Sequence, residues 1–201
     1  MGTSGGLRLP AARRRRQLLD VALEVFGDRG FDGTTMSELA REAGVTKPVL
    51  YQHFSSKREL FLEVVADVGC RLREEVALAT SFADRPRGQV EAGFAAYFRF
   101  VSSDRNAFKL LIGVISGRDG EFRSAVRGVE EEMASTIAEL ISAGISPEHR
   151  QVIAYVLVGM AESASRHWIE QERAGNPEML AEWVAELAWA GLRGVSEEVT
   201  A

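Results

Sequence analysis

Apolar residues recur along most of this 201-residue chain at the three- and four-residue spacing of amphipathic helices. No stretch of useful length alternates with the two-residue period of a strand. The pattern therefore predicts an all-α protein with about nine helices. The predicted helices cover residues from about 13 to 29, 36–43, 47–54, 57–80, 87–103, 105–115, 122–141 (ended by Gly144), 147–174 and 177–191.

Two short helical segments with a tight turn between them follow the first long helix. Thr35 and Glu38 have the spacing of a capping box, in which a hydroxyl and a carboxylate satisfy amides at a helix start. Gly44 stands where this helix should end, because glycine adopts a left-handed backbone at little cost. Thr46 is a suitable N-cap for the next helix, and Pro48 is tolerated in its first turn. This arrangement is typical of a helix-turn-helix, whose second helix enters the major groove of DNA.

The outer face of the second helix carries side chains that can contact DNA. Tyr51 offers a hydroxyl to a phosphate or a base edge, and Gln52 and His53 can donate hydrogen bonds there. Lys47 and the Lys57 that follows the helix are positive charges suited to phosphates. Tyr51 could instead be a half-buried packing residue. For each of the two threonines, the alternative to phosphate contact is a hydroxyl that only caps its helix. The predicted DNA-contacting residues of this region are Thr35, Thr46, Lys47, Pro48, Tyr51, Gln52, His53 and Lys57.

This region resembles the N-terminal domain of the TetR (tetracycline-repressor-like) family over about the first third of the chain. The resemblance implies DNA contact for the same threonines, lysines, tyrosine and histidine, and a helical body that binds a small molecule and forms a dimer. Nothing in the remainder of the sequence identifies the effector. The residues that carry the resemblance are Ala22–Phe26, Gly30–Thr35, Leu39–Ala40, Ala43–Val45, Leu50–Lys57 and Leu60.

The distribution of charge agrees with a DNA-binding head. The net charge is −5, yet residues 1–62 contain 10 basic and 7 acidic residues, whereas the remainder contains 14 and 22. A basic head on an acidic body suits a protein that places one end on phosphates; chance asymmetry is the alternative. Four consecutive arginines at a helix start oppose the helix dipole, and phosphate contact would explain them, although a solvated helix end is the plainer interpretation. They are Arg13, Arg14, Arg15 and Arg16.

Several other classes of function find no support in the sequence. The single cysteine, Cys70, allows no intramolecular disulfide, and no apolar run approaches the ~18 residues of a membrane span. His149 and His167 lie about five turns apart on one helix, so they cannot share a metal. No HExxH, cysteine pair, Walker loop or dinucleotide-binding glycine motif is present. We therefore expect a cytoplasmic protein that is not an enzyme and uses no metal or cofactor.

The body offers candidates for a ligand cavity and for a dimer interface. The aromatic and aliphatic bias of the middle helices suggests an apolar ligand, although plain core is the alternative for each residue. The cavity candidates are Phe94, Tyr97, Phe98, Phe108, Leu111, Phe122, Met133 and Tyr155, with His167 and Arg105 as polar anchors. The resemblance implies that the last two helices pair with a second copy, with the monomer's own core as the alternative. The interface candidates are Gly159, Trp168, Trp183, Leu187 and Ala190.

Together these features predict a disordered arm (1–10), a three-helix helix-turn-helix DNA-binding domain (11–57) and a helical effector-binding and dimerisation domain (58–201). The expected function is a ligand-responsive transcriptional repressor. It would bind a near-palindromic operator as a homodimer and be released by a small apolar effector that shifts the dimer geometry. One alternative is a helical small-molecule-binding protein or enzyme with a vestigial head. The other is an architectural DNA-coating protein.

Overall fold

The computed structural model describes residues 10–141, 144–170 and 176–195. In this part of the chain every regular element is an α-helix, so the all-α prediction is confirmed. The predicted arm falls almost wholly outside the described residues, as do residues 171–174 of the predicted eighth helix. The nine described helices are α1 (Ala11–Arg29), α2 (Met36–Glu42), α3 (Lys47–His53), α4 (Lys57–Ser81), α5 (Pro86–Ser103), α6 (Arg105–Ser116), α7 (Gly120–Leu140), α8 (Pro147–Glu170) and α9 (Pro177–Leu192).

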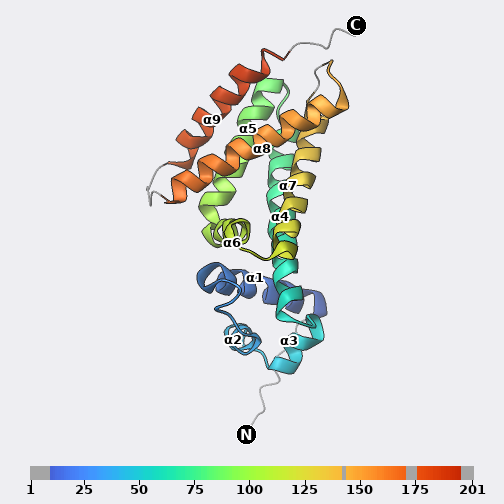
Figure 1. Ribbon diagram of the computed structural model, residues 1–201, viewed down its shortest axis with the longest axis vertical. Helices are drawn as coiled ribbons and strands as arrows, with labels where there is room; N and C mark the ends of the chain where they lie inside the picture. The colour runs from blue at the N-terminus through green and yellow to red at the C-terminus, as the bar shows by residue number, and fades with distance from the viewer. Residues whose placement is uncertain (1–9, 142–143, 171–175, 196–201) are drawn as a thin grey trace.

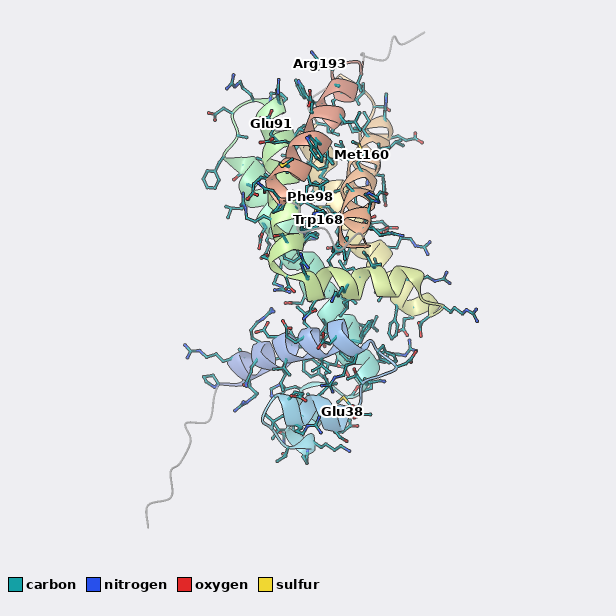
Figure 2. All side chains as sticks on the ribbon, turned by 90° about the vertical axis from the view of Figure 1, so that its left-hand side faces the viewer. Glu38, Glu91, Phe98, Met160, Trp168 and Arg193 are labelled. Atoms are coloured by element: carbon teal, nitrogen blue, oxygen red, sulfur yellow. The ribbon has the colours of Figure 1, made fainter. Side chains whose placement is uncertain are left out.

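The helices form a small head and a larger body (Figure 1). Helices α1 to α3 gather at one end around a shared core, and α5, α7, α8 and α9 form the other end. The long helix α4 runs from the head into the body, where it packs against α5 and α7. Helix α6 lies between the two parts, directly over α1, and the two are seen lengthwise in Figure 2. No described helix is long and apolar enough to cross a lipid bilayer.

The head forms where its sequence pattern places it. Leu39, Ala40 and Ala43 of the first short helix and Leu50 and Phe54 of the second are all buried. The turn between them passes through Gly44 with φ at 67°, a backbone conformation that side-chain-bearing residues rarely adopt. The core of the head therefore fixes the orientation of α3 relative to α2 and keeps its outer face towards solvent.

Three local predictions need correction. Thr46 is the N-cap of α3, but its side chain makes no capping hydrogen bond. Ser56 and Glu59 have the spacing of a second capping box, at the start of α4, but only half of it forms. The Ser56 hydroxyl accepts from the backbone N–H of Glu59, whereas the Glu59 carboxylate accepts from the backbone N–H of Ser55 instead of Ser56. Helix α7 ends at Leu140, before Gly144, which is not among the two described glycines with positive φ.

Ion pairs and close packing tie the head to the body. Arg16 of α1 bridges to Asp67 of α4, and Arg71 one turn further along α4 pairs with Asp67 and with Asp104 at the start of α6. Helix α1 also approaches α6 closely, since a Cβ built on Gly27 would stand 2.7 Å from the Cβ of Asn106. The head is thus joined to the body through α4 and α6 together.

A second connection joins α4 to the start of α7. Arg58 pairs with Asp119 at 2.6 Å and with Glu121 at 2.5 Å, and its guanidinium lies 4.6 Å from the centre of the Phe122 ring. The Arg58 guanidinium holds the pKa of the Asp119 carboxyl below its usual value. The Phe122 ring in turn packs against Phe31 and Phe61, so it belongs to an aromatic cluster at the boundary of head and body.

Candidate nucleic-acid interface and internal cavity

Helix α3 presents a polar outer face over a buried inner one. Tyr51 is 49% exposed, and Lys47, Pro48 and Gln52 are exposed beside it, while Leu50 beneath them is 1% exposed. His53 is half-buried against the ring of Phe54. The outward direction of Lys47, Pro48 and Tyr51 agrees with the prediction. A phenol, an ammonium and a carboxamide at this spacing can donate to phosphates and base edges.

The two candidate threonines differ in what their hydroxyls do. The Thr35 hydroxyl accepts from the backbone N–H of Glu38 at 3.3 Å, and the Glu38 carboxylate accepts from the backbone N–H of Thr35 at 2.8 Å, which completes the predicted capping box. The Thr35 hydroxyl also donates to the Glu38 carboxylate at 2.7 Å. This pairing lowers the pKa of the Glu38 carboxyl. The exposed Thr46 makes no such bond. Thr46 is therefore the threonine whose hydroxyl can meet a phosphate without breaking a cap.

Lys57 does not present its charge to solvent as predicted. Its ammonium donates to the backbone carbonyls of Phe31 and Thr34 at 2.7 and 2.8 Å and lies 4.0 Å from the centre of the Phe31 ring. These contacts fasten the start of α4 to the loop between α1 and α2. The side chain of Lys57 is a structural clamp, and only its backbone amide, in the first turn of α4, still points where an anion could bind.

The four arginines of α1 also divide into two groups. Arg15 pairs with Glu63 and lies over the Phe54 ring, and Arg16 is held by Asp20 and Asp67. Those carboxylates already neutralise both guanidinium groups, so the prediction of phosphate contact is not supported for Arg15 and Arg16. Arg13 is exposed, and among the described residues Arg14 bonds only to the neutral Gln17 amide. Arg13 and Arg14 are the two that can reach a phosphate.

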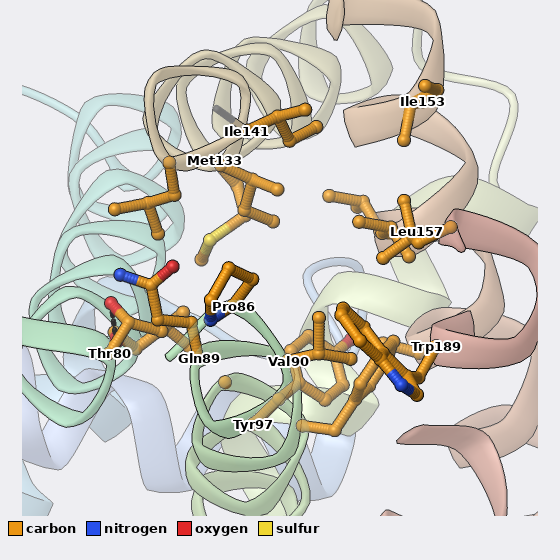
Figure 3. A pocket seen from close by; sticks show the side chains of 18 of the residues that line it. Thr80, Pro86, Gln89, Val90, Tyr97, Met133, Ile141, Ile153, Leu157 and Trp189 are labelled. Atoms are coloured by element: carbon orange, nitrogen blue, oxygen red, sulfur yellow. Dashed lines mark hydrogen bonds between the residues drawn. The ribbon is translucent and has the colours of Figure 1, made fainter. Parts of the chain in front are cut away.

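The body contains a partly open cavity of about 280 Å³, which we call the main cavity (Figure 3). Its wall is almost wholly apolar. The exceptions are Thr80, Gln89, Tyr97 and Trp189, of which Thr80 donates its hydroxyl to carbonyls of its own helix. The lining residues are Val76, Thr80, Pro86, Gln89, Val90, Gly93, Phe94, Tyr97, Met133, Ile137, Leu140, Ile141, Ile153, Leu157, Val158, Ala161, Trp189, Leu192 and Val195.

Five of the predicted cavity residues line internal space. Phe94, Tyr97 and Met133 line the main cavity. Phe108 and Leu111 line a smaller chamber beside it, together with Tyr97 and Met133. All five residues lie on helix faces that are rich in aromatic and aliphatic side chains. The prediction is based on this feature of the sequence.

The remaining predicted cavity residues lie elsewhere. Phe98 is buried in the core of the body and lines neither space. Phe122 belongs to the aromatic cluster at the boundary of head and body. Tyr155 and His167 are exposed on α8, and Arg105 lies 5.8 Å from the centre of the Trp168 ring. Helical spacing shows which residues share a face, but several faces of one helix contact different neighbours.

The cavity residues that the sequence did not single out come from several helices, and two of them stand out. Trp189 enters the main cavity from α9 (Figure 3), and Glu162 faces the smaller chamber from α8. Glu162 lies between Val158 and Ser165 on the inner face of its helix, and such an acidic residue in an apolar row is the feature that could have identified it. Among the described residues, no three His, Cys, Asp or Glu side chains are grouped as a metal site requires.

An apolar surface covers the outer faces of α8 and α9. Trp183 is 61% and Leu187 67% exposed, at successive turns of α9. Gly159 lies on the α8 part of this face, and a Cβ built on it would meet no atom within 4 Å. Ala190 is exposed one turn after Leu187. The large exposed residues of the two helices are Val152, Tyr155, Val156, Met179, Trp183 and Leu187.

Trp168 is the exception among the predicted interface residues. It is 8% exposed and lies inside the body. Its indole N–H finds no hydrogen-bond partner. In this chain Trp168 therefore belongs to the monomer's own core, the alternative that the sequence left open.

Comparisons with known proteins agree with this division into head and body. The sequence profile described as "Bacterial regulatory proteins, tetR family" matches residues 18–64, and the profile "Tetracyclin repressor-like, C-terminal domain" matches residues 86–191. The chain is 34% identical over 196 residues to the HTH-type transcriptional activator FasR of Mycolicibacterium smegmatis. That alignment covers 96% of this chain and 90% of FasR.

Solved structures show the same arrangement of helices. A TetR-like transcriptional regulator from Rhodococcus sp. RHA1 is 31% identical, with a TM-score of 0.74 over 94% of this chain and 100% of that one. The transcriptional regulator FadR from Bacillus subtilis, solved in complex with stearoyl-CoA, is 16% identical with a TM-score of 0.77. The match covers 88% of this chain and 98% of FadR. At that identity the likeness to FadR concerns the fold alone.

Proposed function

The chain belongs to the TetR family of bacterial regulatory proteins, and from this premise we propose that it is a ligand-responsive transcriptional regulator. The observation that carries the proposal is the outer face of α3. Lys47, Tyr51 and Gln52 face solvent there, while the inner face of the helix is fixed in the core of the head. An exposed polar helix face on a rigid support is what reading a DNA groove requires.

We propose that the protein binds a near-palindromic operator as a homodimer through α8 and α9. One head contacts a single half-site, so specific affinity needs two heads about 34 Å apart. Exposed Trp183 and Leu187 are aromatic and aliphatic anchors of the kind that interfaces bury. A symmetric pair would cover the apolar surface of both copies with a four-helix contact.

The effector in this proposal is a molecule with an aliphatic chain, bound in the main cavity. The cavity wall offers apolar contact on nearly all sides, which favours a guest with few polar groups. FadR, which shares the fold, was solved with stearoyl-CoA, and that ligand also carries an aliphatic chain. Binding would shift the population of dimer geometries, because the cavity lies between α4 and the dimer-forming helices.

The remaining parts of the proposal follow from this role. We divide the chain into an N-terminal arm (1–10), a DNA-binding domain (11–57) and an effector-binding and dimerisation domain (58–201). The protein would act in the cytoplasm, where bacterial DNA lies, and would not be an enzyme. We retain repression as the proposed direction of regulation. FasR is named an activator, so a promoter fusion measured with and without this protein must decide the direction.

The test is a DNA-binding titration on the purified chain. A duplex selected from a random pool should bind with an affinity that falls steeply as salt rises, because counterions are released from neutralised phosphates. Adding an aliphatic effector should then change this affinity. An absence of salt-dependent duplex binding would favour a small-molecule-binding protein with a vestigial head. Equal binding of all sequences would indicate a DNA-coating protein.

A further inference from the structure

A second internal space lies beyond the main cavity, and we call it the inner chamber. It has a volume of about 30 Å³ and receives residues from α4, α5, α6, α7 and α8. Tyr97, Met133 and Val158 line both spaces and form the partition between them. Met133 is unbranched and readily changes rotamer, so the partition can yield to a guest that extends from one space into the other.

One side of the inner chamber is charged. Glu130 of α7 and Glu162 and Arg166 of α8 face it, while its other walls are apolar. None of these three side chains forms a hydrogen bond or an ion pair with another described residue, and the Arg166 Nε is buried without a partner. Buried polar groups are nearly always satisfied, so a buried guanidinium nitrogen without a partner, beside two half-buried carboxylates, needs an explanation.

Two hydroxyl groups lie at the partition between the two spaces. Ser165 is fully buried, and its hydroxyl lies next to the Tyr97 hydroxyl at the partition. The surrounding helices therefore contribute apolar walls and polar groups to one small space, and its polar side has both acceptors and donors. Such a combination of apolar walls and one polar side is typical of a binding site for a polar group.

The signs of these charges select the kind of group that fits. An anionic group would pair with Arg166 but be repelled by Glu130 and Glu162. A cationic group would pair with the carboxylates but be repelled by Arg166. A neutral hydroxyl can donate to a carboxylate and accept from the guanidinium at the same time.

We propose that the inner chamber is a binding site for the terminal hydroxyl of an aliphatic effector whose chain fills the main cavity. The sizes agree, because a water molecule occupies about 30 Å³ of liquid. The inner chamber has room for one such group, and the main cavity for on the order of ten. The effector is therefore an alcohol with a chain of about ten carbons. This inference rests on the proposed function for the claim that the main cavity binds an effector.

The test compares four ligands with the same number of non-hydrogen atoms by isothermal titration calorimetry with the full chain. They are 1-decanol, methyl nonyl ether, decylamine and nonanoate. The alcohol should bind about tenfold more tightly than the ether, because the ether accepts but cannot donate a hydrogen bond to the carboxylates. It should also bind more tightly than the amine and the acid, each of which meets a like charge.

Variants locate the preference in the inner chamber. Glu162→Leu should remove the advantage of the alcohol over the ether, whereas Glu139→Leu should keep it, since Glu139 is exposed on α7. If Glu162→Leu fails to fold, Glu162→Gln should weaken but not abolish the preference. The four-ligand comparison on the unaltered chain needs no variant.

The proposal is overturned if the ether binds as well as the alcohol, if the amine or the acid binds best, or if Glu162→Leu retains the full preference. Binding of none of the four ligands would overturn it as well. Duplex binding is measured on the same samples. Absence of an alcohol preference with salt-dependent DNA binding intact refutes only the inner-chamber site, whereas an alcohol preference without DNA binding refutes only the proposed regulatory function.

Discussion

At the scale of single residues, the polar side chains of the head divide into those that hold it together and those that face solvent. Lys57 donates to two backbone carbonyls, and Arg15 and Arg16 pair with carboxylates of α4. Lys47 and Tyr51 remain at the surface. Substitutions in the first group should therefore act on stability, and substitutions in the second should act on DNA binding.

Tyr51→Ala should abolish specific binding to the operator while leaving the fold and the dimer intact. The side chain is half-exposed and belongs to the outer face of α3, so its removal leaves the head's core complete. Electrophoretic mobility shifts measure operator binding, and light scattering measures the mass of the particle. Phe82→Ala, at an exposed aromatic residue that follows α4, is the control for DNA contact. Unfolding of the Tyr51 variant would instead mean that the ring has a structural role.

The arginines of α1 should give two different results. Replacing Arg13 and Arg14 by Ala should weaken binding to all sequences alike and flatten the salt dependence by about one unit for each phosphate that is no longer neutralised. Replacing Arg16 by Ala should lower the free energy of unfolding by about 1 kcal/mol, because Asp67 is deprived of a partially exposed ion-pair partner. Salt-dependent binding isotherms and urea unfolding measure the two effects. An effect of the first pair on the operator alone would make them base readers.

Glu162 should make stability depend on pH. Burial and the neighbouring Glu130 raise the pKa of the Glu162 carboxyl to about 7, although Arg166 opposes this, and the Tyr97 hydroxyl faces the same group. The folded protein then binds more protons than the unfolded chain, so stability falls as pH rises from about 4.5 to about 7. Glu162→Gln should raise the free energy of unfolding by about 2 kcal/mol at pH 8 and have little effect at pH 4. If the effect of Glu162→Gln on the free energy of unfolding did not change with pH, the pKa of Glu162 would be the same in the folded and unfolded states.

The sequence could not show which polar residues have a structural role, because that role depends on partners far away along the chain. The Lys57 ammonium bonds to carbonyls 23 and 26 residues away, and Arg16 meets a carboxylate 51 residues away. Local patterns contain no information on such pairs. The outward face of α3 was predictable, since helical spacing fixes which side of a short helix its buried residues occupy.

At the scale of helices, α8 and α9 have two different faces. Ala181, Ala185 and Ala188 pack inward from α9, while Trp183 and Leu187 face out. The inward face completes the monomer, and the outward face is left without a partner in the described chain. This division explains why the sequence of both helices is too apolar for full contact with solvent, and why Trp168 does not belong with the exposed set.

Replacing Trp183 and Leu187 together by Glu should convert the dimer to a folded monomer. Two carboxylates on an apolar contact would each lose hydration if the copies met, whereas they are well tolerated on an exposed helix face. Analytical ultracentrifugation gives the mass, and far-ultraviolet circular dichroism checks that helical content is unchanged. Glu182→Gln, at an exposed neighbour on α9, is the control. A variant that remains dimeric would place the interface elsewhere.

Helix boundaries were largely predictable because caps act locally. Thr35, Asn176 and Asp104 each bond to a backbone amide of the helix that they begin. The packing of α6 over α1 was not predictable in the same way. It depends on the close approach of Gly27 and Asn106, which are 79 positions apart in the chain, and no local pattern encodes such an approach.

At the scale of the whole molecule, the head and the main cavity are linked through α4. This helix begins beside α3, pairs with α1 and α6 on the way, and lines the cavity at Val76 and Thr80. A guest that displaces the α4 wall would therefore also displace the head. In a symmetric dimer a small rotation of α4 changes the separation of the two α3 helices, which is the quantity that an operator senses.

The most direct test of this account is the spacing of half-sites in duplexes that the purified protein selects from a random pool. We predict two inverted half-sites whose centres lie about 10 base pairs, or a multiple of that, apart. They should be bound by an even number of chains, and Tyr51→Ala should select nothing. Recovery of single half-sites bound by a monomer, or of no preferred sequence at low salt, would contradict the claim that two α3 helices read DNA together.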